Sequence, residues 1–176
     1  MHKREPVPEV KLFYAVLYSD DSVLEQVKSI LSEKWGRIDF ISPSFDFDKT
    51  DYYFPEMGGG LKRIFMSFER TITPEALIDA KLFSDKAEEE LSDCGRRLAN
   101  LDPGYIDCAK LVLASFKGAS HKIYIDKGIY ADLTLRYSKG RFEPFGWTFP
   151  DFKDESYYPC LLKIRNIYKE QIKHVR

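Results

Sequence analysis

The nine residues VKLFYAVLY, 10–18, are almost continuously apolar and rich in residue types that favour strands. Polar residues bound this run on both sides. A half-buried strand carries a polar side chain at every second position, whereas a strand covered on both faces has a continuous apolar run. We therefore predict that residues 10–18 form an inner strand of a sheet.

The sequence on the C-terminal side of this run predicts a helix followed by two more strands. Val23, Val27 and Leu31 recur at helical spacing within residues 21–34, and a glycine closes this segment. Residues 38–41 are predicted to form a short second strand. Residues 61–70 alternate between two faces, as in a strand, and the helix predicted next spans residues 74–92.

The following segment is harder to assign. Residues 96–101 favour a short strand, and Asp102-Pro103-Gly104-Tyr105 has the composition of a turn. Residues 107–115 are compatible with a helix or a buried strand, and we favour a short helix. A meander of strands at 120–125, 129–137 and 141–145 then leads to a final helix at 156–173.

The register of the meander follows from its turns. A three-residue loop at 126–128 places Lys122 opposite Asp132 and groups the apolar side chains of both strands on one face. A two-residue turn at Lys139-Gly140 places Arg136 opposite Glu143. Both pairs join opposite charges, which supports this register.

Together these elements predict one α+β domain spanning residues 1–176, with a flexible N-terminal segment at 1–8. The order strand, helix, strand, strand, helix, strand is that of a ferredoxin-like fold with a mainly antiparallel sheet. A C-terminal β-meander and a closing helix extend it.

Composition excludes some classes of function. The 27 basic and 28 acidic residues nearly cancel, giving a net charge of −1, so no overall positive field attracts nucleic acid or an anionic membrane. No segment has the form of a signal peptide or a membrane span. Three widely spaced cysteines suit reduced thiols, and we expect a cytoplasmic protein. The sequence leaves the oligomeric state open.

Several segments resemble a known family. VKLFYAVLYSDD, SFDFDKTDYY, EMGGGLKRIFMSFER, LDPGY, KLVLAS, SHKIYIDKGIYADLTLRY, GRFEPFGWTFPDF and IYKEQ, in this order, are similar to the bacterial family catalogued as domain of unknown function 4416. The resemblance covers nearly the whole chain. It implies no catalytic residues, because the family is uncharacterised. Its members are often labelled GTP-binding proteins in genomes, but this sequence has no P-loop and no [NT]KxD segment for reading guanine.

The three glycines at 58–60 precede Lys62 and Arg63. A P-loop needs the spacing GxxxxGK[ST] between a strand and a helix, and neither the spacing nor the hydroxyl is present. The alternation after the glycines predicts a turn that leads into a strand. A lid that closes over an anionic ligand with Lys62 or Arg63 is the alternative.

Acidic and aromatic residues are concentrated just before these glycines. Asp46, Asp48 and Asp51, with Glu56 nearby, form a candidate site for a divalent metal, since hard cations prefer carboxylate oxygens. Solvated loop acids are the alternative explanation. Tyr52 and its aromatic neighbours are candidates for excluding water from a ligand site at the same end of the sheet.

His121 is the candidate catalytic residue, as a general base, and a structural, hydrogen-bonded imidazole is the alternative. We expect it to join the charged cluster if its strand begins at the same end of the sheet. Tyr130 and Arg136 lie on the polar face of the meander and are candidate ligand-binding residues, although cross-strand ion pairs explain that face equally well.

Two functions from different classes remain open. The first is binding of a small anionic or phosphorylated ligand, with metal-assisted catalysis as an extension. The second is a noncatalytic adaptor whose aromatic loops contact a macromolecule. A concave cluster of His121 with the loop acids and Lys62 or Arg63 favours the first, and dispersal of these residues around the surface favours the second.

Overall fold

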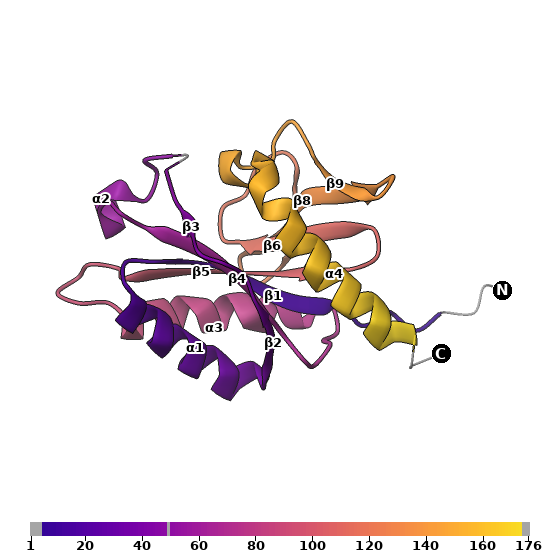
Figure 1. Cartoon of the computed structure of the whole chain (residues 1–176), viewed down its shortest axis with the longest axis horizontal. Helices are drawn as coiled ribbons and strands as arrows, with labels where there is room; N and C mark the ends of the chain where they lie inside the picture. The colour runs from indigo at the N-terminus through magenta and orange to yellow at the C-terminus, as the bar shows by residue number, and fades with distance from the viewer. Residues whose placement is uncertain (1–4, 49, 174–176) are drawn as a thin grey trace.

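A computed structural model describes residues 5–48 and 50–173 of the chain. Its strands form one antiparallel sheet with the order β2-β4-β1-β5-β6-β8-β7, in which β3 pairs with β4 and β9 pairs with β8. Helices cover both faces: α1 and α3 lie on one side, and α4 crosses the other (Figure 1). The structure is therefore a mixed α and β fold with a large antiparallel sheet and a C-terminal helix, as expected.

The strands are β1 (Lys11–Tyr18), β2 (Ile38–Ile41), β3 (Phe45–Asp46), β4 (Lys62–Phe68), β5 (Ala99–Ile106), β6 (Lys110–Ser115), β7 (Lys122–Asp126), β8 (Ile129–Ser138) and β9 (Arg141–Pro144). The helices are α1 (Asp21–Trp35), α2 (Phe54–Met57), α3 (Ala76–Glu90) and α4 (Tyr158–Lys173), with short 3₁₀ helices η1 (Pro150–Lys153) and η2 (Glu155–Tyr157) before α4. Within the described residues, no helix is long and apolar enough to cross a membrane.

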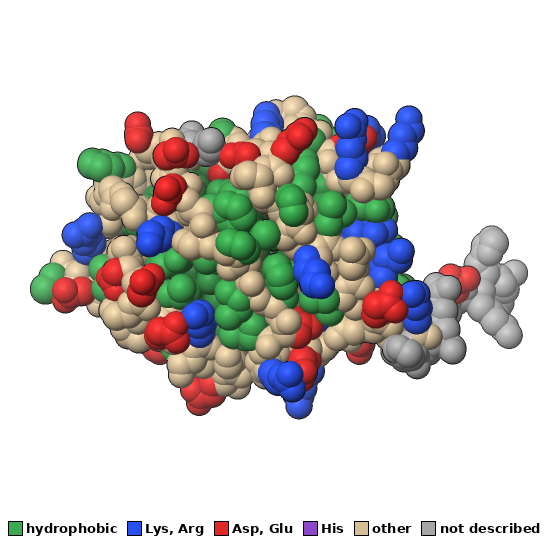
Figure 2. Space-filling model, viewed as in Figure 1, with side chains coloured by type: hydrophobic (Ala, Val, Ile, Leu, Met, Phe, Trp, Pro, Cys, Tyr) green, Lys and Arg blue, Asp and Glu red, His purple; other side chains and the backbone are tan. Residues whose placement is uncertain are grey.

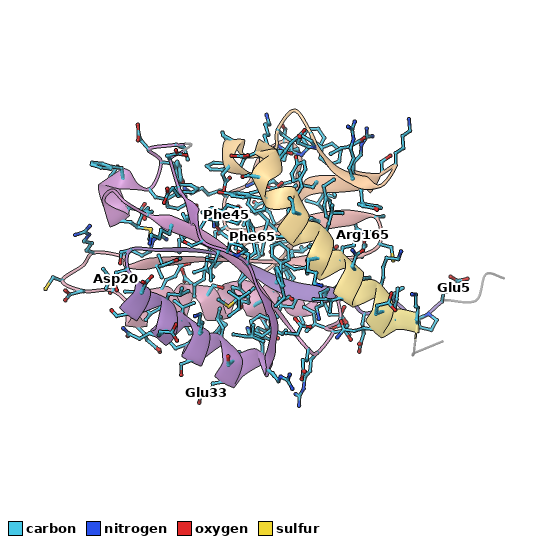
Figure 3. All side chains as sticks on the ribbon, viewed as in Figure 1. Glu5, Asp20, Glu33, Phe45, Phe65 and Arg165 are labelled. Carbon is cyan, nitrogen blue, oxygen red and sulfur yellow. The ribbon has the colours of Figure 1, made fainter. Side chains whose placement is uncertain are left out.

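Strand β1 lies between β4 and β5, and all eight of its residues are buried. Alternate side chains, such as Tyr14, pack with α1 and α3. The others, such as Phe13, pack with β4, η1 and α4. On this second face Phe45 and Phe65 lie close together near the centre of the molecule (Figure 3), with their ring centroids 6.4 Å apart. The prediction of an inner strand covered on both faces is confirmed.

The predictions for residues 102–105 and 107–115 were wrong. Asp102-Pro103-Gly104-Tyr105 lies inside β5, and the second segment contains the strand β6. Gly104 is required by close packing: a Cβ there would lie 2.6 Å from the carbonyl oxygen of Val112 and 2.7 Å from the Phe13 ring. Pro103 has no backbone N–H to donate to a neighbouring strand. It is tolerated because β5 begins to pair with β6 only at the next residue, so no hydrogen bond to β6 is lost at Pro103.

The register of the β7–β8 hairpin was predicted in part. Lys122 faces Asp132 as expected. The connecting loop, however, has two residues, Lys127 and Gly128, which both have positive φ, and Asp126 faces Ile129. A bulge between Tyr124 and Asp126 absorbs the difference of one residue.

The glycines at 58–60 lead into a strand, as predicted. Gly58 ends α2 with φ of 80°, Gly60 has φ of 74°, and β4 begins two residues later. Of the N-terminal segment expected to be flexible, residues 1–4 lie outside the described residues, and residues 5–9 have no regular secondary structure.

Candidate functional site: a mixed-charge cavity

Strands β5 and β6 separate at one end of the sheet. β5 pairs with β1 along its whole length but with β6 only at three positions, where Gly104–Ile106 face Leu111–Leu113. Beyond this point a cavity of about 340 Å³ lies between the two strands. Side chains of α3 reach it from one side, and residues around α2 and η1 close it from the other.

Basic and acidic side chains line this cavity in nearly equal numbers. The basic residues are Arg63, Lys81, Arg97, Lys117 and Lys122, and the acidic residues are Glu56, Asp85, Glu88, Asp102, Asp132 and Asp151. Aromatic residues complete the wall: Tyr52, Tyr53, Phe116, Phe149 and Phe152. The net charge of the lining alone therefore does not select a ligand.

Arg63 forms the floor of the cavity. It faces Leu17 across the β1–β4 pair and is only 2% exposed. Its Nη2 donates to Oδ2 of Asp151 at 2.9 Å, and its Nη1 lies 3.7 Å from Oδ2 of Asp102. The guanidinium also lies over the rings of Phe47 and Phe152, at 5.1 and 6.0 Å from their centroids. The N–H groups of a guanidinium all lie in its plane, so a hydrogen-bonding partner must approach its edge.

This buried pair is incompletely bonded. Nε and Nη1 of Arg63 and Oδ1 of Asp151 have no hydrogen-bond partner within the described structure. Burial raises the pKa of Asp151, and the positive charge of Arg63 opposes that shift. Burial lowers the pKa of Arg63, but the carboxylates of Asp151 and Asp102 more than offset this effect, so the guanidinium stays charged.

Asp102 connects this floor to α3. Its Oδ1 lies 3.6 Å from Nζ of Lys81, and its Oδ2 accepts a hydrogen bond of 2.7 Å from Nδ2 of Asn100. Arg63, Lys81 and Asn100 thus all converge on one carboxylate, which holds the side chains of β4, β5 and α3 together.

Arg97 joins three segments at the side of the cavity. Its Nη1 donates to Oε2 of Glu88 at 3.0 Å, and its Nη2 lies 2.9 Å from Oε2 of Glu56 in α2. Glu88 also accepts a 2.5 Å hydrogen bond from the backbone of Leu101. Burial raises the pKa of Glu88 to about 7, although Lys81 and Arg97 lower it. This carboxyl therefore titrates near neutral pH.

Two lysines lie at the rim: Lys117 in the β6–β7 connection and Lys122, the first residue of β7. Lys122 is 3.2 Å from Oδ2 of Asp132 and donates to Oγ of Ser115 at 3.0 Å. The ammonium of Lys117 contacts the hydroxyl of Tyr52 and lies 4.7 Å from its ring centroid. Lys117 is exposed, so this ammonium group can turn toward a ligand without leaving a buried charge unpaired.

The structure brings some of the predicted ligand-binding residues together and leaves others apart. Arg63 and Tyr52 line the cavity, whereas Lys62, Tyr130 and Arg136 are not among its lining residues. Lys62 faces Asp46 across the β3–β4 pair. Tyr130 packs against Tyr124, with ring centroids 5.5 Å apart.

Arg136 forms the expected cross-strand pair with Glu143, at 2.8 Å. This contact places it in the β8–β9 hairpin.

His121 lies next to the cavity and is not among its lining residues. Its Nε2 is 3.8 Å from Oδ1 of Asp132, which does line the cavity, and its ring stacks on Trp147 at a centroid distance of 5.3 Å. A catalytic role for His121 stays a prediction.

For the metal site, no group of three His, Cys, Asp or Glu side chains in the described part of the chain is placed to hold an ion. Asp46, Asp48 and Asp51 thus do not form such a group.

Sequence reasoning missed most of the cavity's charged residues. Asp102 was assigned to a turn, and Asp151 lies far from Arg63 in sequence. The segment Lys117-Gly118-Ala119-Ser120-His121-Lys122 could have been found, because two lysines and a serine around a glycine, between strands, are typical of loops that bind anions.

The fold and the cavity define an α+β protein with a mixed-charge site at one end of an antiparallel sheet. The model of the family described as "Domain of unknown function (DUF4416)" matches residues 8–168, so the chain belongs to that family and the resemblance is confirmed. No curated protein and no solved structure matches the chain.

Proposed function

We propose that the protein binds a small anionic ligand in the cavity beside Arg63. The observation that carries the proposal is an excess of unpaired donors. Four buried side-chain atoms of the described residues lack a hydrogen-bond partner, and all belong to residues that line this cavity: Nε and Nη1 of Arg63, Nε of Arg97, and Oδ1 of Asp151. Three of the four are donors, so an acceptor-rich ligand complements the site.

The free-energy cost of leaving these atoms unpaired also supports anion binding. A buried polar group left without a partner costs about 1–3 kcal/mol, and a ligand that supplies acceptors recovers part of that cost. Lys117 adds an exposed positive charge at the rim, where the ligand enters. Phosphate and carboxylate groups carry the negative charge that suits Lys117 at the rim, and other acceptor atoms of such a ligand can reach the unpaired donors of the floor.

The test is isothermal titration calorimetry of the purified protein with inorganic phosphate and with citrate, repeated on variants. Lys117→Ala should weaken binding severalfold without unfolding the protein, because the side chain is exposed. Lys163→Ala, which removes an exposed lysine of α4, is the matched control and should bind like the wild type. Absence of saturable binding to both anions overturns the proposal.

A role in catalysis would extend this proposal. His121 would act as a general base, with Asp132 orienting its ring. Its ring, however, stacks on Trp147, and His121 is not among the residues that line the cavity with Arg63. A metal-assisted reaction would need ligands beyond Asp46, Asp48 and Asp51. We therefore propose binding as the primary function.

A second candidate function is contact with a macromolecule, which is favoured by the separation of Lys62 and His121 from the cavity that Arg63 lines. Figure 2 shows hydrophobic side chains reaching the surface across the middle of the face that carries α4. Exposed aromatic residues also lie near the cavity: Phe54 is 61% exposed, Tyr52 46% and Phe149 39%, and the rings of Tyr52 and Phe149 are 6.0 Å apart. If Phe54→Ala leaves the binding of small anions unchanged, this result favours the first function.

We also propose that the chain is one domain with a ferredoxin-like core and acts in the cytoplasm. The strand order β2-β4-β1-β5, with α1 and α3 on one face, supports the core. Free thiols at Cys94, Cys108 and Cys160 are compatible with a reducing compartment. Limited proteolysis that released a stable half of the chain would contradict the single domain.

A further inference from the structure

We infer that the ligand is a phosphorylated polyol, whose hydroxyl groups bind between Arg63 and Asp151 while its phosphate stays at the rim of the cavity. This inference rests on the proposed function and adds the chemical class of the ligand. The floor and the rim of the cavity offer unequal environments to such a ligand.

The floor cannot take the charged group of the ligand. Arg63 is already balanced by two carboxylates, Asp151 at 2.9 Å and Asp102 at 3.7 Å from its nitrogen atoms. Asp151 is completely buried and keeps one oxygen, Oδ1, without a partner. An anionic oxygen placed at this floor would face that oxygen, and two like charges in a buried site repel strongly.

The unpaired atoms at the floor instead require a group that both donates and accepts. Nε and Nη1 of Arg63 need an acceptor, whereas Oδ1 of Asp151 needs a donor. A hydroxyl group offers both functions from one oxygen atom, and neighbouring hydroxyls of a polyol can serve the separate atoms. Phe47 and Phe152 pack near the guanidinium, and its donors lie in its plane, so a hydroxyl must approach its edge.

The rim suits the phosphate. Lys117 is exposed, and its ammonium is held near Tyr52. Lys122 donates to Ser115 and forms an ion pair with Asp132, and an ammonium has three donors, so at least one is left for a ligand. The cavity volume of about 340 Å³ is at the lower end of the range for small-molecule sites and fits a ligand of a few carbon atoms.

The experiment compares three probes by isothermal titration calorimetry: inorganic phosphate, propyl phosphate and glycerol 3-phosphate. The last two have the same carbon number and charge and differ in two hydroxyl groups. We expect glycerol 3-phosphate to bind roughly tenfold more tightly than propyl phosphate, the effect of one or two hydrogen bonds. Lys117→Ala should weaken both by the same factor, and Asp151→Asn should reduce the preference between them.

Equal affinity for the two esters overturns the hydroxyl inference and leaves anion binding intact. Failure of all three probes to bind overturns both. An Asp151→Asn variant that folds, binds propyl phosphate normally and keeps the full preference also overturns the assignment of the hydroxyl to Asp151. Should this variant not fold, the comparison of the two esters on the wild-type protein still decides the question.

Discussion

Arg63 and Asp151 are 88 residues apart in the sequence, yet the Nη2 of the arginine donates to Oδ2 of the aspartate at 2.9 Å inside the protein. Both side chains are buried, at 2% and 0% exposed. The pair joins the inner strand β4 to the segment that precedes α4. It therefore links the stability of the fold to the floor of the proposed ligand site.

We predict that Arg63→Met destabilises the protein by about 3–5 kcal/mol, because it leaves the Asp151 carboxyl buried without its cation. The double variant Arg63→Met/Asp151→Leu should recover at least half of that loss. Urea denaturation measures both. Arg136→Met, which breaks the exposed pair with Glu143, is the control and should cost less than about 1 kcal/mol. A similar small cost for Arg63→Met would contradict the prediction.

Gly104→Ala should destabilise the protein by about 1–3 kcal/mol, since the new methyl group would lie 2.6 Å from the carbonyl oxygen of Val112 and force β5 and β6 apart. Gly146→Ala is the matched control: no atom lies within 4 Å of the added Cβ, and its φ is not in the left-handed region. Thermal unfolding compares the two variants. Equal melting temperatures would show that the contact at Gly104 relaxes at little cost.

Gly104 also shows why part of the fold escaped sequence reasoning. Strand β1 and helix α1 were predictable because their apolar periodicity is local. Asp102-Pro103-Gly104-Tyr105 has the composition of a turn, and its role as a strand depends on Val112 and Phe13, which no local pattern reveals. A short apolar run such as β6 suits a helix or a strand equally well, and its partners in the sheet decide the outcome.

The site was predictable to a similar extent. Arg63 and Tyr52 were expected to lie together because they are close in sequence, and both line the cavity. Asp151 and Lys81 come from distant segments and enter the cavity only because β5 and β6 separate, a feature of tertiary packing. The pair of Arg136 with Glu143 was predictable from turn length. The pair of Lys122 with Asp132 was also predicted, but its loop is one residue shorter than expected and a bulge restores the register.

Glu88 should make stability fall as pH rises through the weakly acidic range. Its pKa is about 7 in the folded protein against an ordinary value of 4.5, so between these values the folded state holds a proton that the unfolded state has lost. Relative to Glu88→Gln, wild-type stability should decrease between pH 4.5 and 7 by at most about 1.4 kcal/mol per pH unit. Denaturation at several pH values measures it. Glu89→Gln, at an exposed position of α3, should keep the wild-type slope.

Arg97 should contribute, after Lys81, to lowering the pKa of Glu88. Its guanidinium donates to Glu88 at 3.0 Å and favours the ionised carboxyl, although burial has the larger, opposite effect. Arg97→Gln removes that positive charge, so the pKa of Glu88 should rise further, and carboxyl ¹³C chemical shifts followed against pH measure it.

The same variant releases Glu56, so amide hydrogen exchange should become faster in α2 while β1 keeps its protection. Arg37→Gln, which breaks an exposed pair with Glu69, is the control and should change neither quantity. A pKa of Glu88 that falls or stays constant in Arg97→Gln would show that Arg97 does not stabilise its charge.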